Sequence, residues 1–508
     1  MKTTLSALLA LAMFAGPVVS QEPYEGETLI SLLTSNDTYS IDLDHNILRT
    51  WHGDAVPATF AYLRADGSIV RPCLDTGGHF GGGGTGGRIQ IIDSNDVVIW
   101  DYLFSTYDYQ QHHDIEPMPN GNVLVIAWER KTYEEAIAAG RQQLSGEMWV
   151  TMIAEIEPVG ATGGNIVWEW HLWDHLIQDA DPSKDNYGVV TDHPELVDIN
   201  YGPISSADWD HANSVDYNPQ LDQVIFSARK TNEFYIIDHS TTTEEAAGHT
   251  GGNSGMGGDI LYRWGNPQVY DRGDETDQYY FGIHAAGWID TGLPGAGRIL
   301  TFNNGNRAGT VNDYSSVEEI DPPVDAGGNY SITPGEPFEP TAPSWVYSDA
   351  PSFYSQNRAG AFRMPNGNTL ITDTQHRNIF EVTSDGTKVW TYLPSAAVHR
   401  APRYWYDLTG VEESPPLSAR LEQNFPNPFN PTTRIVFEID RPSMVKLKIY
   451  DVSGTLVRTL VEETRHAHRY DEIWDGRDSR NRRVASGIYF CRLEAAGSVH
   501  TKKMVLLK

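Results

Sequence analysis

Short runs of alternating apolar and polar residues, each bounded by glycine, proline or asparagine, follow one another along most of this chain. One phrase returns almost unchanged, as Pro-Asn-Gly-Asn-Val-Leu at 119–124 and as Pro-Asn-Gly-Asn-Thr-Leu at 365–370. Looser versions begin at Pro219 and Pro294. Each copy is a turn followed by a β-rich run, so the pattern predicts repeated hairpins in an all-β protein.

A second recurring element is a strand that ends in Trp or Tyr. It occurs at 46–51, 96–100, 165–170, 259–264 and 387–392. Strand, turn, strand, turn and a strand with a terminal aromatic residue together make one blade of a β-propeller. About five or six such units fit between residues 28 and 408, with insertions at 131–148, 171–205 and 310–350. The alternative is a β-sandwich or a pair of β-sandwiches, which do not usually repeat one turn phrase at blade spacing.

Both ends of the chain differ from this repeat. Residues 1–20 have a charged start, a short apolar core and small residues before Gln21, as in a secretory signal peptide. That apolar run is about half the ~20 residues that span a membrane, so we expect an exported protein with no membrane span. The repeat region therefore occupies 21–410, a linker rich in Pro and Ser follows at 411–420, and a new module begins at 421.

Composition limits the possible partners. The formal net charge is −31, although the C-terminal module is basic. The acidic surface of the repeat region repels nucleic acid, so we expect no nucleic-acid partner, and an anionic substrate requires a local cationic pocket. The two cysteines, Cys73 and Cys491, lie in different predicted domains, and we expect no disulfide between them.

Three histidines occupy the same place in successive repeats. His113, His211 and His284 each lie about six to ten residues before the recurring turn, at the start of the innermost strand of a blade. Equivalent positions in different blades point to one axis, so we expect the three side chains to converge. A single histidine is more often a structural residue, but three in register indicate a site.

The chemistry of three converging histidines is open to two readings. Three histidines with one open position hold zinc in many enzymes. Arg229, however, follows the next strand of the repeat that contains His211 and should face the same axis. Its guanidinium would repel a metal cation, whereas histidines beside an arginine suit a tetrahedral oxyanion.

This ordered set of residues resembles the active site of the bacterial arylsulfate sulfotransferases. The likeness extends over about 30–395 and includes 36–51 and the glycine-rich stretch ending Gly86-Gly87-Arg88. It implies a six-bladed β-propeller that moves sulfuryl groups from aryl sulfates to phenols, without a cofactor and without 3′-phosphoadenosine-5′-phosphosulfate. It also implies roles for individual residues. His284 would be the nucleophile, His113, His211 and Arg229 would bind the sulfuryl oxygens, His211 would also protonate the leaving phenolate, and Asn213 would help to position it.

The last ~90 residues resemble the C-terminal sorting domain of type IX secretion substrates. The resemblance is carried by Asn424-Phe425-Pro426-Asn427-Pro428-Phe429-Asn430-Pro431, by the strand-like runs 445–451 and 486–490, and by the C-terminal run 502–508. It implies a small immunoglobulin-like β-sandwich at 421–508, related to hook-capping proteins. It also implies the type IX secretion machinery as a partner and delivery through the periplasm and outer membrane, to the cell surface or the medium.

One departure from the sulfotransferase pattern leaves other functions open. His284 is flanked by Ile283 and Ala285, so the neighbours that orient the imidazole in that family are missing. A non-catalytic surface propeller that binds sulfated glycans or a protein is the first alternative. A metal-dependent hydrolase or lyase that uses His113, His211 and His284 is the second. The glycine-rich stretch at 77–87 lacks the Gly-Lys-Ser/Thr ending of a phosphate loop, and we expect a flexible or tightly turned loop there.

Overall fold

The chain divides into two compact units, Met1–Trp405 and Tyr406–Lys508. The computed structural model describes residues 22–203, 206–307, 313–405, 419–421, 424–439, 443–452, 455–465, 468–495 and 498–507. The expected signal peptide at 1–20 and nearly all of the expected linker lie outside this part. No helix in the described residues is long and apolar enough to cross a membrane.

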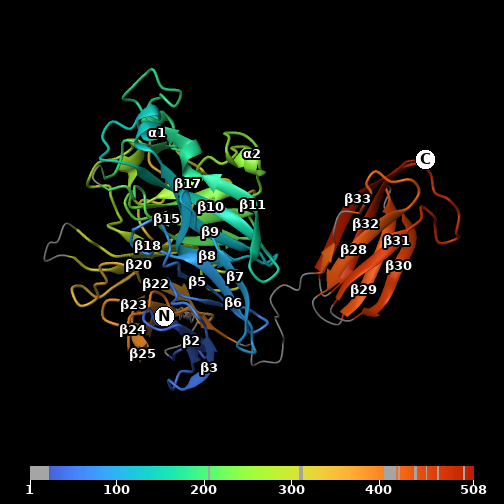
Figure 1. The fold of residues 1–508 in the computed structure, drawn as a ribbon, viewed down its shortest axis with the longest axis horizontal. Helices are drawn as coiled ribbons and strands as arrows, with labels where there is room; N and C mark the ends of the chain where they lie inside the picture. The colour runs from blue at the N-terminus through green and yellow to red at the C-terminus, as the bar shows by residue number, and fades with distance from the viewer. Residues whose placement is uncertain are drawn as a thin grey trace, which may run out of the picture. The chain divides into compact units, whose positions relative to one another are not determined.

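Among its described residues the first unit contains six four-stranded sheets, within each of which neighbouring strands are antiparallel, and one small two-stranded parallel sheet (Figure 1). They are, sheet by sheet, β1 (Glu27–Ser31), β2 (Asp37–Ile41), β3 (Ile47–His52) and β26 (Arg403–Tyr404); β4 (Tyr62–Leu63), β5 (Ile69–Leu74), β6 (Gly87–Ile92) and β7 (Val98–Leu103); β8 (Tyr109–Pro117), β9 (Val123–Lys131), β10 (Met148–Val159) and β11 (Gly163–His171); β14 (Ala212–Asn218), β15 (Gln223–Ala228), β16 (Glu233–Asp238) and β17 (Tyr262–Trp264); β18 (Ile283–Trp288), β19 (Ile299–Asn303), β20 (Ser316–Ile320) and β21 (Trp345–Ser348); and β22 (Gly360–Arg363), β23 (Thr369–Asp373), β24 (Asn378–Val382) and β25 (Lys388–Tyr392). A β-sandwich has two sheets, so this arrangement excludes the sandwich alternative for this unit.

The two recurring sequence elements have fixed places in these sheets. The turns that begin at Pro119, Pro219, Pro294 and Pro365 each join the first strand of a sheet to the second. The aromatic-ended runs are the last strands of their sheets, namely β3, β7, β11, β17 and β25. The repeat in the sequence is therefore a repeat of the four-stranded sheet.

Both ends of the first unit meet in one sheet. Glu27 and Thr28 of β1 pair with Tyr404 and Arg403 of β26, and Leu29 N–H donates to the Pro402 carbonyl at 2.9 Å. Arg403 also forms a buried ion pair with Glu381 of β24. The last strand of the unit is thus joined to its first strand and to the preceding sheet.

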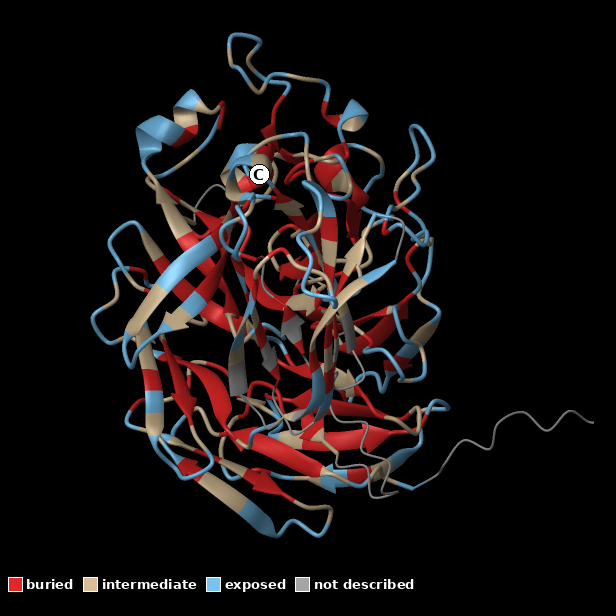
Figure 2. Cartoon of the chain, turned by 90° about the vertical axis from the view of Figure 1, so that its right-hand side faces the viewer, coloured by how far each residue is buried: buried red, intermediate tan, exposed pale blue. Residues whose placement is uncertain are grey.

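Burial falls from the inner strands to the outer ones (Figure 2). All six residues of β15 and all six of β16 are buried, as expected for strands covered on both faces. The outer strands β3, β7 and β11 are mostly exposed or half-buried, and their buried residues are tryptophans. Trp51, Trp128, Trp170 and Trp209 are among the largest fully buried side chains.

Short elements occupy the predicted insertions 131–148 and 171–205 and two further loops, whereas the predicted insertion 310–350 contains strands β20 and β21 of the fifth sheet. Helix α1 (Tyr133–Ala138) begins with a capping box between Thr132 and Glu135, and α2 (Thr243–Ala246) begins with one between Thr242 and Glu245. The remaining elements are η1 (Leu172–His175), β12 (Leu176–Ile177), η2 (Val190–Asp192), β13 (Val197–Asp198) and η3 (Pro267–Tyr270).

The second unit contains a three-stranded sheet in the order β27-β28-β31 and a four-stranded sheet in the order β30-β29-β32-β33. One core, which includes Phe437, Leu447, Trp474 and Leu493, draws residues from both sheets. The strands are β27 (Arg420–Leu421), β28 (Thr433–Ile439), β29 (Ser443–Asp451), β30 (Leu456–Arg465), β31 (His468–Trp474), β32 (Gly487–Ala495) and β33 (Ser498–Leu506). Cys73 of the first unit and Cys491 of this unit are both buried and free.

Candidate active site

The predicted site residues lie at irregularities in the first strands of three sheets. The pairing register breaks between Gln111 and Ile115 in β8, between Ala212 and Ser214 in β14, and between Ile283 and Ala285 in β18. His113 and His211 have positive φ values of 50° and 55°, a conformation that is uncommon for residues other than glycine. A β-bulge re-aims side chains, and local strain of this kind occurs at functional sites.

These irregularities bring the three histidines together. One ring nitrogen from each of His113, His211 and His284 lies within 4.8 Å of one from each of the others. The ring centroids of His113 and His211 are 4.8 Å apart, and those of His113 and His284 are 6.4 Å apart. The three residues are at most 8% exposed. The convergence expected from their register in the repeat is therefore present.

Each of the three rings is held through Nδ1. His113 Nδ1 lies 2.8 Å from His112 Nδ1, His211 Nδ1 bonds to Asp208, and His284 Nδ1 lies 2.5 Å from Asn304 Oδ1. Nε2 is therefore the atom that each ring has left for a ligand. Three imidazoles held in fixed positions, each with one ring nitrogen left over, suit the binding of a small polar group between them.

Asn304 determines the tautomer of His284. Its Nδ2 donates to the carbonyls of Ser355 at 2.6 Å and Arg358 at 3.0 Å, so Oδ1 is the atom that faces the imidazole. Because Oδ1 only accepts, His284 Nδ1 carries the hydrogen and Nε2 of the neutral ring has a free lone pair. Burial, followed by the charge of Arg229, holds the pKa of His284 well below its usual range. The ring is thus a neutral imidazole with its nucleophilic nitrogen exposed to the gap.

Asp208 has the corresponding role at His211. It also accepts from Trp128 Nε1 at 3.0 Å and lies 3.4 Å from Lys230 Nζ. Burial alone would raise the pKa of Asp208, but the hydrogen bond and charge of His211, with Lys230, lower it to about 2. A carboxylate that stays ionised beside an imidazole fixes the ring and stabilises its protonated form.

Arg229 supplies a cation beside these rings. It directly follows β15, and its backbone N–H donates to the His211 carbonyl at 3.1 Å. Its charge lowers the pKa of His284, and the charge of Asp208 acts on the Arg229 guanidinium in turn. Its Nε is buried without a hydrogen-bond partner in the described part of the chain. Unused guanidinium donors beside neutral imidazoles favour an anion over a metal cation.

Asn213 is placed differently from the other predicted residues. It is fully buried, its Nδ2 donates to the Ile283 carbonyl at 2.8 Å, and its Oδ1 accepts from Ser227 Oγ at 2.5 Å. In this arrangement it ties β14 to β18. Its contact with a substrate stays a prediction.

A buried ion pair between Arg400 and Asp114 lies beside the histidines. Arg400 Nη1 donates to Asp114 at 2.8 Å, and its Nη2 donates to the carbonyls of Asn213 at 2.9 Å and His284 at 3.1 Å. Asp114 in turn accepts from Val215 N–H at 3.2 Å. One guanidinium thus links β8, β14 and β18 at their irregular positions, which fixes the relative positions of the three histidines.

The glycine-rich stretch closes over His113. The Gly84 carbonyl accepts from His113 N–H at 2.7 Å. A Cβ atom on Gly84 would lie 2.2 Å from His113 Nε2, and Gly84 has a φ of +75°. Of the two expectations for this stretch, the tightly turned loop is therefore the one that the structure bears out.

Four residues near the site were not singled out from the sequence: Asp208, Asn304, His399 and Arg400. Asp208 stands three residues before His211, and this spacing is the one signal for it in the sequence. His399 is 1% exposed, its ring centroid lies 6.5 Å from that of His113, and neither of its nitrogens has a partner among the described residues. Although Ile283 and Ala285 replace the flanking residues of the family pattern, Asn304, directly after β19, orients the His284 ring.

A second histidine cluster is accounted for by its own contacts. His175 Nδ1 and His249 Nδ1 lie 2.8 Å and 2.7 Å from Asp259 Oδ1, and His175 Nε2 lies 2.9 Å from the Ala246 carbonyl. Both nitrogens of His175 therefore already lie against protein oxygens, so neither is turned toward open space for a metal.

Comparisons with known proteins agree with the motifs in the sequence. The model of the family Arylsulfotransferase (ASST) matches residues 83–331, and the model of the Secretion system C-terminal sorting domain matches residues 423–507. No curated protein matches the sequence. The sorting domain indicates export to the cell surface or secretion.

Solved structures give only distant likenesses. A protein of unknown function from Bacteroides caccae is 10% identical with a TM-score of 0.42, and the match covers 75% of this chain and 100% of that one. Selenomethionine-substituted virginiamycin B lyase from Staphylococcus aureus is 12% identical with a TM-score of 0.35, over 74% of this chain and 83% of that one. Both scores are too low to bear on the function.

Proposed function

We propose that this chain, which matches the arylsulfotransferase family over residues 83–331, is an aryl-sulfate sulfotransferase. It moves a sulfuryl group from a phenolic sulfate ester to a phenol through a sulfated His284, and it does not use 3′-phosphoadenosine-5′-phosphosulfate. The family match supports arylsulfotransferase-type function. The observation that carries the mechanism is the convergence of His113, His211 and His284 with every Nδ1 already engaged.

In the first half of the reaction, His284 Nε2 attacks the sulfur of the donor ester. The new N–S bond forms as the bond from sulfur to the phenolic oxygen breaks, and the phenolate leaves with that electron pair. Asn304 accepts from Nδ1–H and so stabilises the positive charge that develops on the ring. Arg229 and His113 donate to the sulfuryl oxygens, where fixed donors stabilise the transition state. When His211 carries a proton on Nε2, it gives that proton to the leaving phenolate.

In the second half, an acceptor phenol takes the place of the product. Its oxygen attacks sulfur, its proton passes to His211 Nε2, and the N–S bond breaks to restore the lone pair of His284. Asp208 offsets the charge of the protonated His211 in both halves. Splitting the transfer in two lets one binding site serve donor and acceptor in turn.

We further propose that the six sheets are the blades of one six-bladed β-propeller. The pairing of β26 with β1 supports closure, since it brings the last strand of the unit into the first sheet. Residues 21–410 would form this domain and 411–420 a linker. Residues 421–508 would form an immunoglobulin-like sorting domain, whose two sheets and shared core support the sandwich. The type IX machinery would recognise this domain after a signal peptide at 1–20 directs export.

The test is release of nitrophenolate from 4-nitrophenyl sulfate, with and without phenol. The proposal expects release that depends on phenol, ping-pong kinetics, and loss of at least a thousandfold in His284→Ala. No release from folded protein across several aryl sulfates would refute transferase activity. Binding of sulfate esters without turnover would then favour the non-catalytic propeller that binds sulfated glycans or protein.

A metal-dependent hydrolase or lyase is a second candidate, because His113, His211 and His284 are spaced as metal ligands. Arg229 beside these rings argues against a cation there. Stoichiometric zinc in the purified protein, lost to a chelator together with activity, would support this candidate. Activity that withstands the chelator would exclude it.

A further inference from the structure

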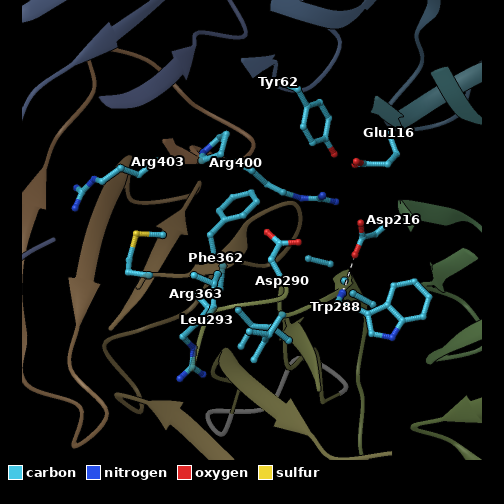
Figure 3. Close-up of a pocket in the computed structure, with 18 of the residues that line it drawn as sticks. Tyr62, Glu116, Asp216, Trp288, Asp290, Leu293, Phe362, Arg363, Arg400 and Arg403 are labelled. Atoms are coloured by element: carbon cyan, nitrogen blue, oxygen red, sulfur yellow. Dashed lines mark hydrogen bonds between the residues drawn. The ribbon is translucent and has the colours of Figure 1, made fainter. Parts of the chain in front are cut away.

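Apart from the histidine cluster, the first unit contains a cavity further along the inner strands β8, β14 and β18. It has a volume of about 390 Å³ and is bordered by residues of β4, β8, β14, β18, β22 and β26 (Figure 3). Glu116, Asp216 and Asp290 on its wall lie three to six residues beyond His113, His211 and His284, which is roughly 10–20 Å along an extended strand. Arg400 lies between this cavity and the histidines, because it lines the cavity and bonds to the His284 carbonyl.

Three carboxylates on this wall have no cationic partner. Figure 3 shows Glu116, Asp216 and Asp290 directed toward one space, with the Tyr62 hydroxyl beside Glu116. No ion pair within the described residues includes any of the three, and Asp216 accepts only from the N–H groups of Trp288 and Tyr217.

The arginines that line the same cavity are already engaged. Arg363 pairs with Glu319 at 2.6 Å, Arg400 pairs with Asp114 at 2.8 Å, and Arg403 pairs with Glu381. Each guanidinium therefore has a carboxylate partner, although Arg363 shares Glu319 with Arg298, and Arg363 Nε, Arg400 Nε and Arg403 Nη2 are buried without a hydrogen-bond partner among the described residues. Above the Asp216 pKa of about 7, the cavity therefore presents a net negative charge to a molecule that enters it.

The remainder of the wall is apolar and aromatic. Trp288, Leu293, Leu300, Phe362 and Met364 contribute to it. A cavity of this size is typical of a site for a small organic molecule and holds far more than one water or metal ion. Carboxylates opposite aromatic rings are the chemistry that recognises an ammonium group on an apolar body.

We propose that this cavity is a second binding site, which takes an organic ammonium ion with an aromatic or alkyl body. The site is distinct from the histidine cluster and does not depend on the sulfuryl transfer proposed there. A second sulfate ester does not fit, because the unpaired carboxylates would repel it.

The pKa values of the carboxyl groups in the cavity are sensitive to a bound cation. Burial, followed by repulsion from Asp216, Asp114 and Asp290, holds the pKa of Glu116 well above its usual range. Burial and the charge of Asp290 raise the pKa of Asp216 to about 7. These raised pKa values favour the protonated carboxyl groups in the absence of a cation, and a bound ammonium ion would favour their ionised form.

Calorimetric titration of the full chain with 2-phenylethylammonium at pH 8 tests the proposal, with 2-phenylethanol as the neutral probe of equal shape. We expect saturable binding of one ammonium ion and at least tenfold weaker binding of the alcohol. Asp290→Asn, at an exposed position, and Glu116→Gln should each weaken ammonium binding about five- to tenfold. The exposed Asp44→Asn serves as the matched control and should bind as the unmodified chain does.

Several results would overturn the proposal. They are absence of ammonium binding, equal binding of the alcohol, or unchanged binding in both Asp290→Asn and Glu116→Gln. Calcium that binds and displaces the ammonium ion would make the site a metal site instead. His284→Ala should bind the ammonium ion normally, so failure of this proposal and failure of sulfuryl transfer remain distinguishable.

Discussion

At the scale of single residues, the site depends on side chains that hold other side chains. His284 is oriented by Asn304, His211 by Asp208, and the three inner strands by Arg400. Each of these contacts is buried, where an unpaired polar group is costly and a fixed one is effective. The chemistry of the histidines therefore depends on residues that touch no substrate.

Asn304→Ala removes the acceptor that selects the tautomer of His284. We expect kcat with 4-nitrophenyl sulfate to fall about 10- to 100-fold, with KM changed little, because the nucleophile is misoriented while the oxyanion contacts remain. Nitrogen NMR of the His284 ring should show that one tautomer no longer dominates. Asn46→Ala, at an exposed position, is the matched control. An unchanged kcat in Asn304→Ala would remove Asn304 from the mechanism.

Asp208→Asn withdraws the charge that supports protonated His211. A poor leaving group such as unsubstituted phenolate needs a proton more than 4-nitrophenolate does. We therefore expect the variant to lose about tenfold more activity toward phenyl sulfate than toward 4-nitrophenyl sulfate. Equal losses on both donors would mean that His211 does not act as the acid.

At the scale of secondary-structure elements, irregular strands and a glycine loop create the site within a regular repeat. The bulges in β8, β14 and β18 turn functional side chains inward. The loop before β6 packs on His113 so closely that a methyl group has no room. Sheet-to-sheet contacts hold this arrangement in place.

Gly84→Ala tests the loop. Gly121→Ala is its matched control, because Gly121 has a φ of +91° and nothing within 4 Å of an added Cβ. Both variants should lose about 1–2 kcal/mol of stability from the left-handed backbone. Only Gly84→Ala should also displace His113 and lower kcat/KM at least tenfold. Equal activity in the two variants would show that the loop does not set the position of His113.

His239 joins the third and fourth sheets. It lies 2.8 Å from Asp222 and 3.0 Å from Glu155 of β10. Burial lowers its pKa, but the two hydrogen-bonded carboxylates outweigh burial and raise the pKa to about 9. Because the folded-state value is raised, its stabilisation is complete below the unfolded value of about 6.5 and is lost as the pH rises through about 9.

His239→Gln should therefore lower the free energy of unfolding at pH 7 by about 1–3 kcal/mol. It should also flatten the decline in stability between pH 7 and 10. Urea unfolding at several pH values measures both effects. A variant that keeps the steep alkaline decline would contradict the assignment of that decline to His239.

At the scale of the whole molecule, the first unit contains the candidate active site and the second unit matches a secretion sorting domain. Every site residue lies between 84 and 400, and the strand that completes the first sheet ends at Tyr404. A chain that ends at Trp405 should keep kcat within about twofold, whereas one that ends at Arg400 should fold poorly because β1 loses its partner. Circular dichroism and nitrophenolate release check both. Loss of activity in a folded chain that ends at Trp405 would show that the second unit contributes to the site.

Much of the fold and of the histidine cluster is predictable from the sequence, because each repeat places equivalent residues at equivalent positions of a sheet. The recurring turn fixes the end of each inner strand, and His113, His211 and His284 stand about six to ten residues before it, so their convergence follows from the repeat. Asn304 and Arg400 were not predictable, because each belongs to an irregular segment between strands and reaches the site only through tertiary packing. The carboxylates of the proposed ammonium cavity stand three or four residues before Pro119, Pro219 and Pro294, but their spacing matches no motif that indicates a ligand.

The central claim is that His284 carries the sulfuryl group. The most direct measurement is intact-protein and peptide mass spectrometry after brief exposure to 4-nitrophenyl sulfate without acceptor. The account predicts one added sulfuryl group, located on His284, that disappears when phenol is added and never forms in His284→Ala. Steady turnover with no adduct, or an adduct on another residue, would contradict it.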